Sequence, residues 1–140
     1  MATPSNVLFP WNDSYSVNIG IIDAQHKQLV GAINELHLAM SEGRAKDQLG
    51  QILSKLVNYT KGHFATEEKL MESRGYADYA AHKAEHDRLT STVTDFQRRF
   101  MSNEVGLTLE IMEFLKNWLA KHILGSDRKY SPFLNAKGVR

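Results

Sequence analysis

The sequence predicts an all-α fold, specifically an antiparallel up-down-up-down four-helix bundle, from three observations. No proline occurs between Trp11 and Ser131, and proline disrupts helix interiors and central strands alike. Apolar residues recur at alternating steps of three and four, which is typical of amphipathic helices, and show no sustained alternation of the kind strands have. The breaks between the periodic stretches are short, so neighbouring helices must run antiparallel.

Four periodic stretches, each with one apolar stripe, define the helices in order. The first covers 19–40, with a stripe of Ile22, His26, Leu29, Ile33, Leu36 and Met40. The second covers 45–73, with Ile52, Leu56, Tyr59, His63, Glu67 and Leu70. The third covers 76–101, with Tyr79, His82, His86, Leu89, Val93, Phe96 and Phe100. The fourth covers 105–124, with Leu107, Ile111, Leu115, Trp118 and His122.

Glycines and polar capping residues mark the breaks, at Ser41-Glu42-Gly43, Ser73-Arg74-Gly75 and Ser102-Asn103. We therefore expect one domain over 1–140, with an arm at 1–18, the bundle at 19–127 and a short tail at 128–140.

Composition and charge exclude several classes of function. The chain has 17 Lys and Arg against 16 Asp and Glu, a formal charge of +1, so neither nucleic acid nor an anionic membrane is an expected partner. Without cysteine there are no disulfides, thiolate metal sites or cysteine nucleophiles. No apolar run approaches the ~20 residues of a membrane span, and the first eleven residues lack a secretory pattern, so we expect a cytoplasmic protein.

Ionisable side chains occupy core-facing positions in every predicted helix: His26, His63, Glu67, His82, His86 and His122. A charged carboxylate in an apolar core costs several kcal/mol unless it is compensated. Hydrogen-bonded core histidines are the alternative, but they need several separate buried partners, and the stripes offer few polar groups. A bound metal compensates the whole set at once. His37 lies one step off its stripe and is not an expected ligand.

The pairs of candidate ligands differ in how strongly their spacing indicates a metal site. His82 and His86, four residues apart on a buried stripe, chelate naturally, whereas His63 and Glu67 alone also fit a salt-bridged surface pair. Asp127 follows His122 by five residues, which cannot share a face of a straight α-helix. We expect Gly125 to end the helix, so that the chain swings Asp127 back over the bundle.

The number of candidate ligands indicates two metal ions. Neutral imidazole suits zinc, copper, iron and nickel. Seven ligands are too many for one tetrahedral zinc, but they suit two ions that share the carboxylates. If both carboxylates and a solvent-derived group bridge two octahedral ions, one coordination position stays open for a small molecule such as dioxygen.

These residues resemble the hemerythrins, and specifically the single-domain bacterial hemerythrins. The resemblance runs from Trp11 to Tyr130 and includes Asp23-Ala24-Gln25-His26-Lys27, His63-Phe64 with Glu67-Glu68 and Met71, Gly75-Tyr76, His82-Lys83-Ala84-Glu85-His86, and Trp118-Leu119 with His122 and Asp127. All seven ligand positions of the family are present.

The resemblance implies a di-iron centre with an oxo or hydroxo bridge. It assigns His82, His86 and His122 to one iron, His26 and His63 to the other, and Glu67 and Asp127 to both. Dioxygen would bind at the iron with two histidines. The implied function is reversible dioxygen binding for transport, storage or supply, without enzymatic activity, and the oxygen-consuming recipient protein is not identified.

Two other functions stay open: a sensor of oxygen, redox state or iron, and a di-iron enzyme handling peroxide or nitric oxide. Around the open position we expect Leu119 and Trp118, with Ile22 and Phe64 nearby as ordinary core residues. Gln25, Glu68 and Glu85 either orient imidazoles or face solvent. Trp11 is expected to pack the arm onto the bundle.

Overall fold

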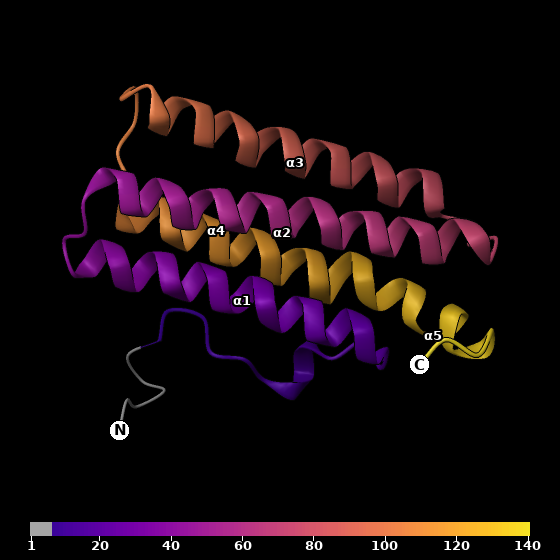
Figure 1. Cartoon of the computed structure of the whole chain (residues 1–140). Helices are drawn as coiled ribbons and strands as arrows, with labels where there is room; N and C mark the ends of the chain where they lie inside the picture. Colours follow the sequence, from indigo (N-terminus) through magenta and orange to yellow (C-terminus); the bar gives the residue numbers. More distant parts are fainter. Residues whose placement is uncertain (1–6) are drawn as a thin grey trace.

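The computed structural model describes residues 7–140 and contains no strand among them. Its four long helices are α1 (Gly20–Ser41), α2 (Lys46–Ser73), α3 (Tyr79–Met101) and α4 (Leu109–Lys121). They run alternately up and down the bundle, α1 packs against α2 and α4, and α2 packs against α3 (Figure 1). The predicted all-α antiparallel bundle is therefore confirmed.

The predicted apolar stripes are the faces that the helices bury. In α1, for example, Ile22, Leu29 and Ile33 are almost fully buried, and burying such a side chain stabilises the fold by about 1.5–3 kcal/mol. The prediction of burial is wrong for one residue of the stripes. Tyr59 is 39% exposed, because the buried face of α2 turns toward Leu53, Leu56, Val57 and Thr60 instead.

Apart from the C-terminal end of the fourth helix, the helix ends lie within four residues of their predicted positions. Gly43 and Gly75 follow α1 and α2 with φ angles of 69° and 72°, a conformation that glycine adopts without strain. The largest difference is at α4, which begins at Leu109 and not at 105. Thr108 caps it there, because its hydroxyl oxygen accepts a hydrogen bond of 3.2 Å from the N–H of Ile111.

The expectation that Gly125 ends the fourth helix is wrong. The helix continues through η3 (His122–Asp127), which has a π-helical hydrogen-bond pattern, into α5 (Arg128–Ala136). Most of the predicted tail is therefore helical, and it lies at the end of the bundle where α1 begins (Figure 1).

Tertiary contacts explain why α5 forms although it contains Pro132. Tyr130 and Leu134 are buried in the core, and the hydroxyl of Ser131 donates to the carbonyl oxygen of Val17 in the arm. Burial and this contact with the arm hold the segment in place, and neither can be recognised from local sequence.

The described part of the arm lies along α1 (Figure 1). The side-chain amide of Asn34 in α1 both donates to and accepts from the backbone of Phe9, at 2.8 Å each. Trp11 is half-buried, and the ammonium group of Lys27 lies 5.4 Å from its ring centre. The predicted packing role of Trp11 is thus confirmed, while the first six residues of the arm lie outside the described part of the chain.

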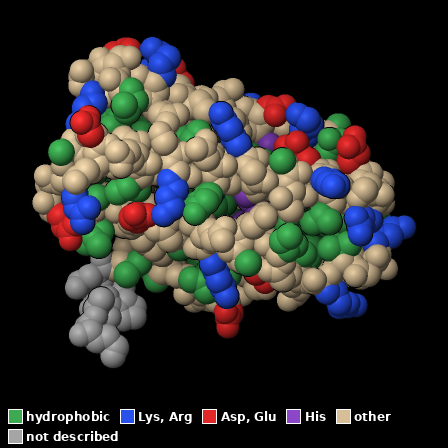
Figure 2. All heavy atoms as spheres, in the orientation of Figure 1, with side chains coloured by type: hydrophobic (Ala, Val, Ile, Leu, Met, Phe, Trp, Pro, Cys, Tyr) green, Lys and Arg blue, Asp and Glu red, His purple; other side chains and the backbone are tan. Residues whose placement is uncertain are grey.

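The surface agrees with the balanced composition. Cationic and anionic side chains are interspersed over the face drawn in Figure 2, where histidine is almost entirely covered by other atoms. Within residues 7–140, no helix has both the length and the apolar composition that crossing a membrane requires.

Candidate metal centre

Five histidines and two carboxylates meet inside the bundle, and none of them is more than 6% exposed. They come from three of the bundle helices and from the η3 turn that follows α4: His26 (α1), His63 and Glu67 (α2), His82 and His86 (α3), and His122 and Asp127 (η3). His37, in contrast, is only half-buried and belongs to no metal-binding group among the described residues.

In α2, α3 and η3, the local helix geometry places the two cluster residues of the segment on the same face. In α2 and α3, a spacing of four residues places both side chains on the same face. In η3 the hydrogen bonds are wider, and the N–H of Arg128 donates to the carbonyl oxygen of Ile123, five residues back. This π-helical turn aligns residues five apart, so Nε2 of His122 lies 3.1 Å from Oδ1 of Asp127. Such turns are rare and occur preferentially at functional sites.

The seven side chains form two groups that share both carboxylates. Within each group the candidate ligand atoms lie within 4.8 Å of one another. We call them the three-histidine group (His82, His86 and His122, with Glu67 and Asp127) and the two-histidine group (His26 and His63, with Glu67 and Asp127).

The carboxylate oxygens lie between the two groups. Oδ1 of Asp127 is 3.0 Å from Nε2 of His82, and its Oδ2 is 3.0 Å from Nε2 of His26. Oε1 of Glu67 is 3.2 Å from Nε2 of both His63 and His86. Each carboxylate therefore faces histidines of both groups.

Many of these converging atoms have no hydrogen-bond partner among the described residues, although they are fully buried. They are Nε2 of His26, His63 and His82, Oε1 of Glu67, and both oxygens of Asp127. A buried polar atom left unpaired costs about 1–3 kcal/mol. Imidazole nitrogens and carboxylate oxygens are good ligands for transition metals, so bound cations would satisfy all these atoms together. The donor set fits a metal centre.

Two imidazoles of the three-histidine group support the same conclusion. Nε2 of His86 and Nε2 of His122 face each other at 3.1 Å. Their Nδ1 atoms face carboxylates, Glu68 at 2.8 Å from His86 and Glu85 in contact with His122. A carboxylate accepts hydrogen bonds, so the ring protons belong on Nδ1. With both rings neutral, the two Nε2 atoms would present lone pairs that repel one another, so a proton or a metal ion must lie between them.

Ionisation inside the cluster also favours a cation. Burial raises the pKa of Glu67, but the charge of His63 and the close contacts with His122, His63 and His86 lower it well below 4.5 in total. Burial and the charge of Glu67 oppose ionisation of Asp127, yet His122 lowers the pKa of this carboxyl below its usual value. Burial disfavours a charge on His122, but Asp127, Glu67 and Glu85 raise its pKa to about 12. The two carboxylates are thus ionised and attract positive charge.

From the sequence, Gln25, Glu68 and Glu85 could either orient imidazoles or face solvent. In the structure, each of them contacts the Nδ1 atom of an imidazole. Glu68 and Glu85 do so as described, and Oε1 of Gln25 lies 2.7 Å from Nδ1 of His63. Outer partners of this kind fix the orientation and tautomer of a ligand histidine. The orienting role is therefore the one that the structure favours over exposure to solvent.

Tyr130 is a site residue that the sequence did not identify. Its hydroxyl donates to Oε2 of Glu67, and its ring stacks near His82, with ring centres 5.5 Å apart. Tyr130 follows Asp127 by three residues, which places both on one side of a continuous helix. This relation was missed from the sequence because the helix was expected to end at Gly125.

The four apolar residues expected near the open position are all buried: Ile22, Phe64, Trp118 and Leu119. Phe64 contacts the imidazoles most closely, because its ring lies flat on His86 with centres 3.8 Å apart and only 3° between planes. That Leu119 and Trp118 flank a ligand position stays a prediction.

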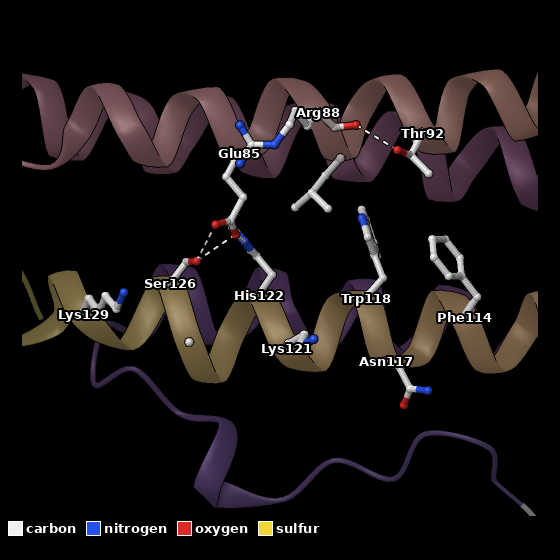
Figure 3. A pocket seen from close by; sticks show the side chains of 12 residues that line it. Glu85, Arg88, Thr92, Phe114, Asn117, Trp118, Lys121, His122, Ser126 and Lys129 are labelled. Carbon is white, nitrogen blue, oxygen red and sulfur yellow. Dashed lines mark hydrogen bonds and ion pairs between the residues drawn. The ribbon is translucent and has the colours of Figure 1, made fainter.

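A surface groove of about 680 Å³ runs between α3 and α4 and reaches His122. Figure 3 shows Trp118 and Phe114 extending from α4 toward α3 along it, and Glu85 contacting Ser126 and His122 at one end. Glu85 is 31% exposed, and this carboxylate lies beside the imidazole of His122 at the end of the groove.

The bundle and its buried cluster together define a metal-binding, all-α four-helix protein. The chain belongs to the hemerythrin family, since residues 17–134 match the Hemerythrin HHE cation binding domain.

Similar proteins cover almost the whole chain. The bacteriohemerythrin of Methylococcus capsulatus is 37% identical over 130 residues, which are 92% of this chain and 98% of the relative. That of Stenotrophomonas maltophilia is 35% identical, covering 92% and 83% of the two chains. A crystal structure of wild-type hemerythrin aligns with a TM-score of 0.86 at 37% identity, covering 91% of this chain and 98% of that one. The resemblance inferred from the sequence is confirmed.

Proposed function

We propose that this protein binds dioxygen reversibly at a pair of iron ions, for oxygen transport, storage or supply. The observation that carries the proposal is that two groups of histidines share both buried carboxylates. Shared carboxylates are the usual means of holding two metal ions side by side inside a helical bundle. Iron is the metal that the family implies, and relatives named bacteriohemerythrin support dioxygen as the ligand.

We assign one iron to the three-histidine group and the other to the two-histidine group, with Glu67 and Asp127 as ligands of both. The position of Asp127 supports this assignment, because its two oxygens face His82 and His26, one from each group. Two ferrous ions held there would supply the electrons that dioxygen takes up on binding and returns on release. The two-histidine group has one protein ligand fewer, which leaves room for dioxygen.

The role of the surrounding residues is to keep water and protons away from the ions. Ile22, Phe64 and Leu119 are at most 3% exposed, and Phe64 covers one side of His86. Water and protons promote irreversible oxidation of ferrous iron. A dry, apolar cover therefore favours release of dioxygen over its consumption, which suits an oxygen-binding protein better than an enzyme.

Reconstitution with ferrous iron under anaerobic conditions tests the proposal. We expect two iron ions per chain and a visible absorption band that forms on adding oxygen and disappears under vacuum. His37→Ala is the matched control, since this histidine lies outside both groups, and it should change neither the iron content nor the band.

Two outcomes would contradict the proposal. Irreversible oxidation without an oxygen-dependent band would exclude reversible binding. Sustained turnover of hydrogen peroxide or nitric oxide by the iron-loaded protein would favour the enzymatic alternative.

A further inference from the structure

The two histidine groups differ in what their Nδ1 atoms contact. In the three-histidine group, Glu68 and Glu85 each place a carboxylate oxygen against an imidazole Nδ1. In the two-histidine group, His63 faces the neutral amide of Gln25 at 2.7 Å. Nδ1 of His26 is buried and has no hydrogen-bond partner in the described part of the chain.

This difference bears directly on metal affinity. A histidine that binds a metal through Nε2 carries its proton on Nδ1 and donates it to a partner. A carboxylate accepts that hydrogen bond more strongly than an amide does. It therefore leaves more electron density on the ring and makes Nε2 the stronger ligand. The negative charge of the partner also attracts a divalent ion.

Two of these partners, Glu85 and Gln25, are held in place by further hydrogen bonds. Ser126 donates to both oxygens of Glu85, at 2.7 and 2.8 Å, although this carboxylate is about one-third exposed. The amide nitrogen of Gln25 donates to the hydroxyl of Thr66 at 3.3 Å, which directs its oxygen to His63.

We propose that Glu68 and Glu85 make the three-histidine group the tighter of the two metal positions, so that a divalent ion fills it first. This inference rests on the proposed function only in treating the site as one for two metal ions. Glu68 and Glu85 are positioning residues, because they act on the metal through His86 and His122. Gln25 is the neutral counterpart that keeps the two-histidine group weaker.

The experiment is a titration of the full-length, metal-free protein with Co²⁺, in competition with a chelator of known affinity. We expect two binding steps in the native protein. Glu68→Gln and Glu85→Gln keep the shape of the acceptor and remove its charge, so each should weaken the first step about tenfold and leave the second unchanged. Gln25→Glu adds the charge to the other group and should tighten the second step by a similar factor.

Glu72→Gln is the matched control, because Glu72 is an exposed residue of α2, and it should change neither step. The unfolding midpoint of each metal-free variant shows whether a substitution alters folding rather than affinity. Equal shifts of both steps, or no shift in any of the three variants, would overturn the inference.

The titration also separates this inference from the proposed function. If Co²⁺ binds in two steps with the expected shifts and the iron form does not release dioxygen, only the proposed function fails. If the two steps shift together while the iron form binds dioxygen reversibly, only this inference fails. Binding of fewer than two Co²⁺ ions per chain would overturn both.

Discussion

The hydroxyl of Tyr130 in α5 donates a hydrogen bond to Oε2 of Glu67 in α2, joining the last helix to a carboxylate of the cluster. Tyr130→Phe removes the donor and leaves a buried acceptor unpaired. We expect the free energy of unfolding of the metal-free protein to fall by about 1–3 kcal/mol, measured by urea denaturation. Tyr76→Phe is the control, since the Tyr76 hydroxyl has no hydrogen bond within residues 7–140 and its ring meets Tyr130 edge-on. Equal losses in both variants would argue against a role for the hydrogen bond.

The continuous helix through Gly125 leads to a prediction about stability. A Cβ atom at Gly125 would meet no atom within 4 Å, and its φ is not positive. Gly125→Ala should therefore raise the free energy of unfolding by about 0.5–1 kcal/mol without changing the metal content. Gly125→Pro should destabilise by about 3 kcal/mol or more. If alanine were as damaging as proline, the helix would not continue through this residue in solution.

Glu67→Ala should reduce the iron content from two ions per chain to one or none, because Oε1 of Glu67 faces histidines of both groups. Iron analysis after reconstitution and gel filtration measures this. Glu72→Ala applies the same truncation to an exposed position of α2 and should keep both ions. Full iron content in Glu67→Ala would exclude Glu67 as a shared ligand.

Leu119→Ala should leave iron bound but speed the irreversible oxidation of the ferrous protein, by admitting water to the proposed dioxygen position. Leu115→Ala is the matched control, because Leu115 is equally buried on α4 one turn earlier. Both truncations should cost about 2–5 kcal/mol of stability, so stability alone cannot account for a difference between them. The measurement is the decay rate of the oxygenated spectrum. Equal rates in the two variants would remove Leu119 from the pocket.

Acid should destabilise the metal-free protein. Hydrogen bonds from His122 and Ser126 outweigh burial and lower the pKa of Glu85 from 4.5 to about 2. A carboxyl with a lowered folded-state pKa contributes stability above its unfolded pKa and loses it as pH falls toward the folded value. The urea midpoint should therefore decrease between about pH 4.5 and 2, and less steeply in Glu85→Gln. Identical slopes in the two proteins would show that Glu85 does not contribute.

The four bundle helices could be predicted because the apolar pattern that determines them is local and repeats along the sequence. A stripe such as Ile22, Leu29 and Ile33 recurs at helical spacing, and glycines such as Gly43 and Gly75 mark the ends. The convergence of the histidines followed from the same periodicity, since residues on the stripes of four packed helices must meet at the centre. Helix starts were less certain, because a single cap such as Thr108 decides them.

The end of the chain could not be predicted, because its cause is tertiary. A glycine and a proline indicate a break, but burial of Tyr130 and Leu134 and the contact of Ser131 with Val17 favour a helix. The π-helical turn leaves no periodic signal of its own. Both the alignment of His122 with Asp127 and the role of Tyr130 depend on this continuous helix, and so only the structure revealed them.

The place of Asp127 in chain order has a consequence for how the centre matures. It is the last of the seven cluster residues, and its two oxygens face different histidine groups. A polypeptide leaves the ribosome with its N-terminus first, so every histidine of the cluster is made before this carboxylate. A growing chain therefore carries all five imidazoles and Glu67 before the second shared carboxylate is made. Assembly of the complete seven-residue cluster must therefore wait until translation has passed Asp127.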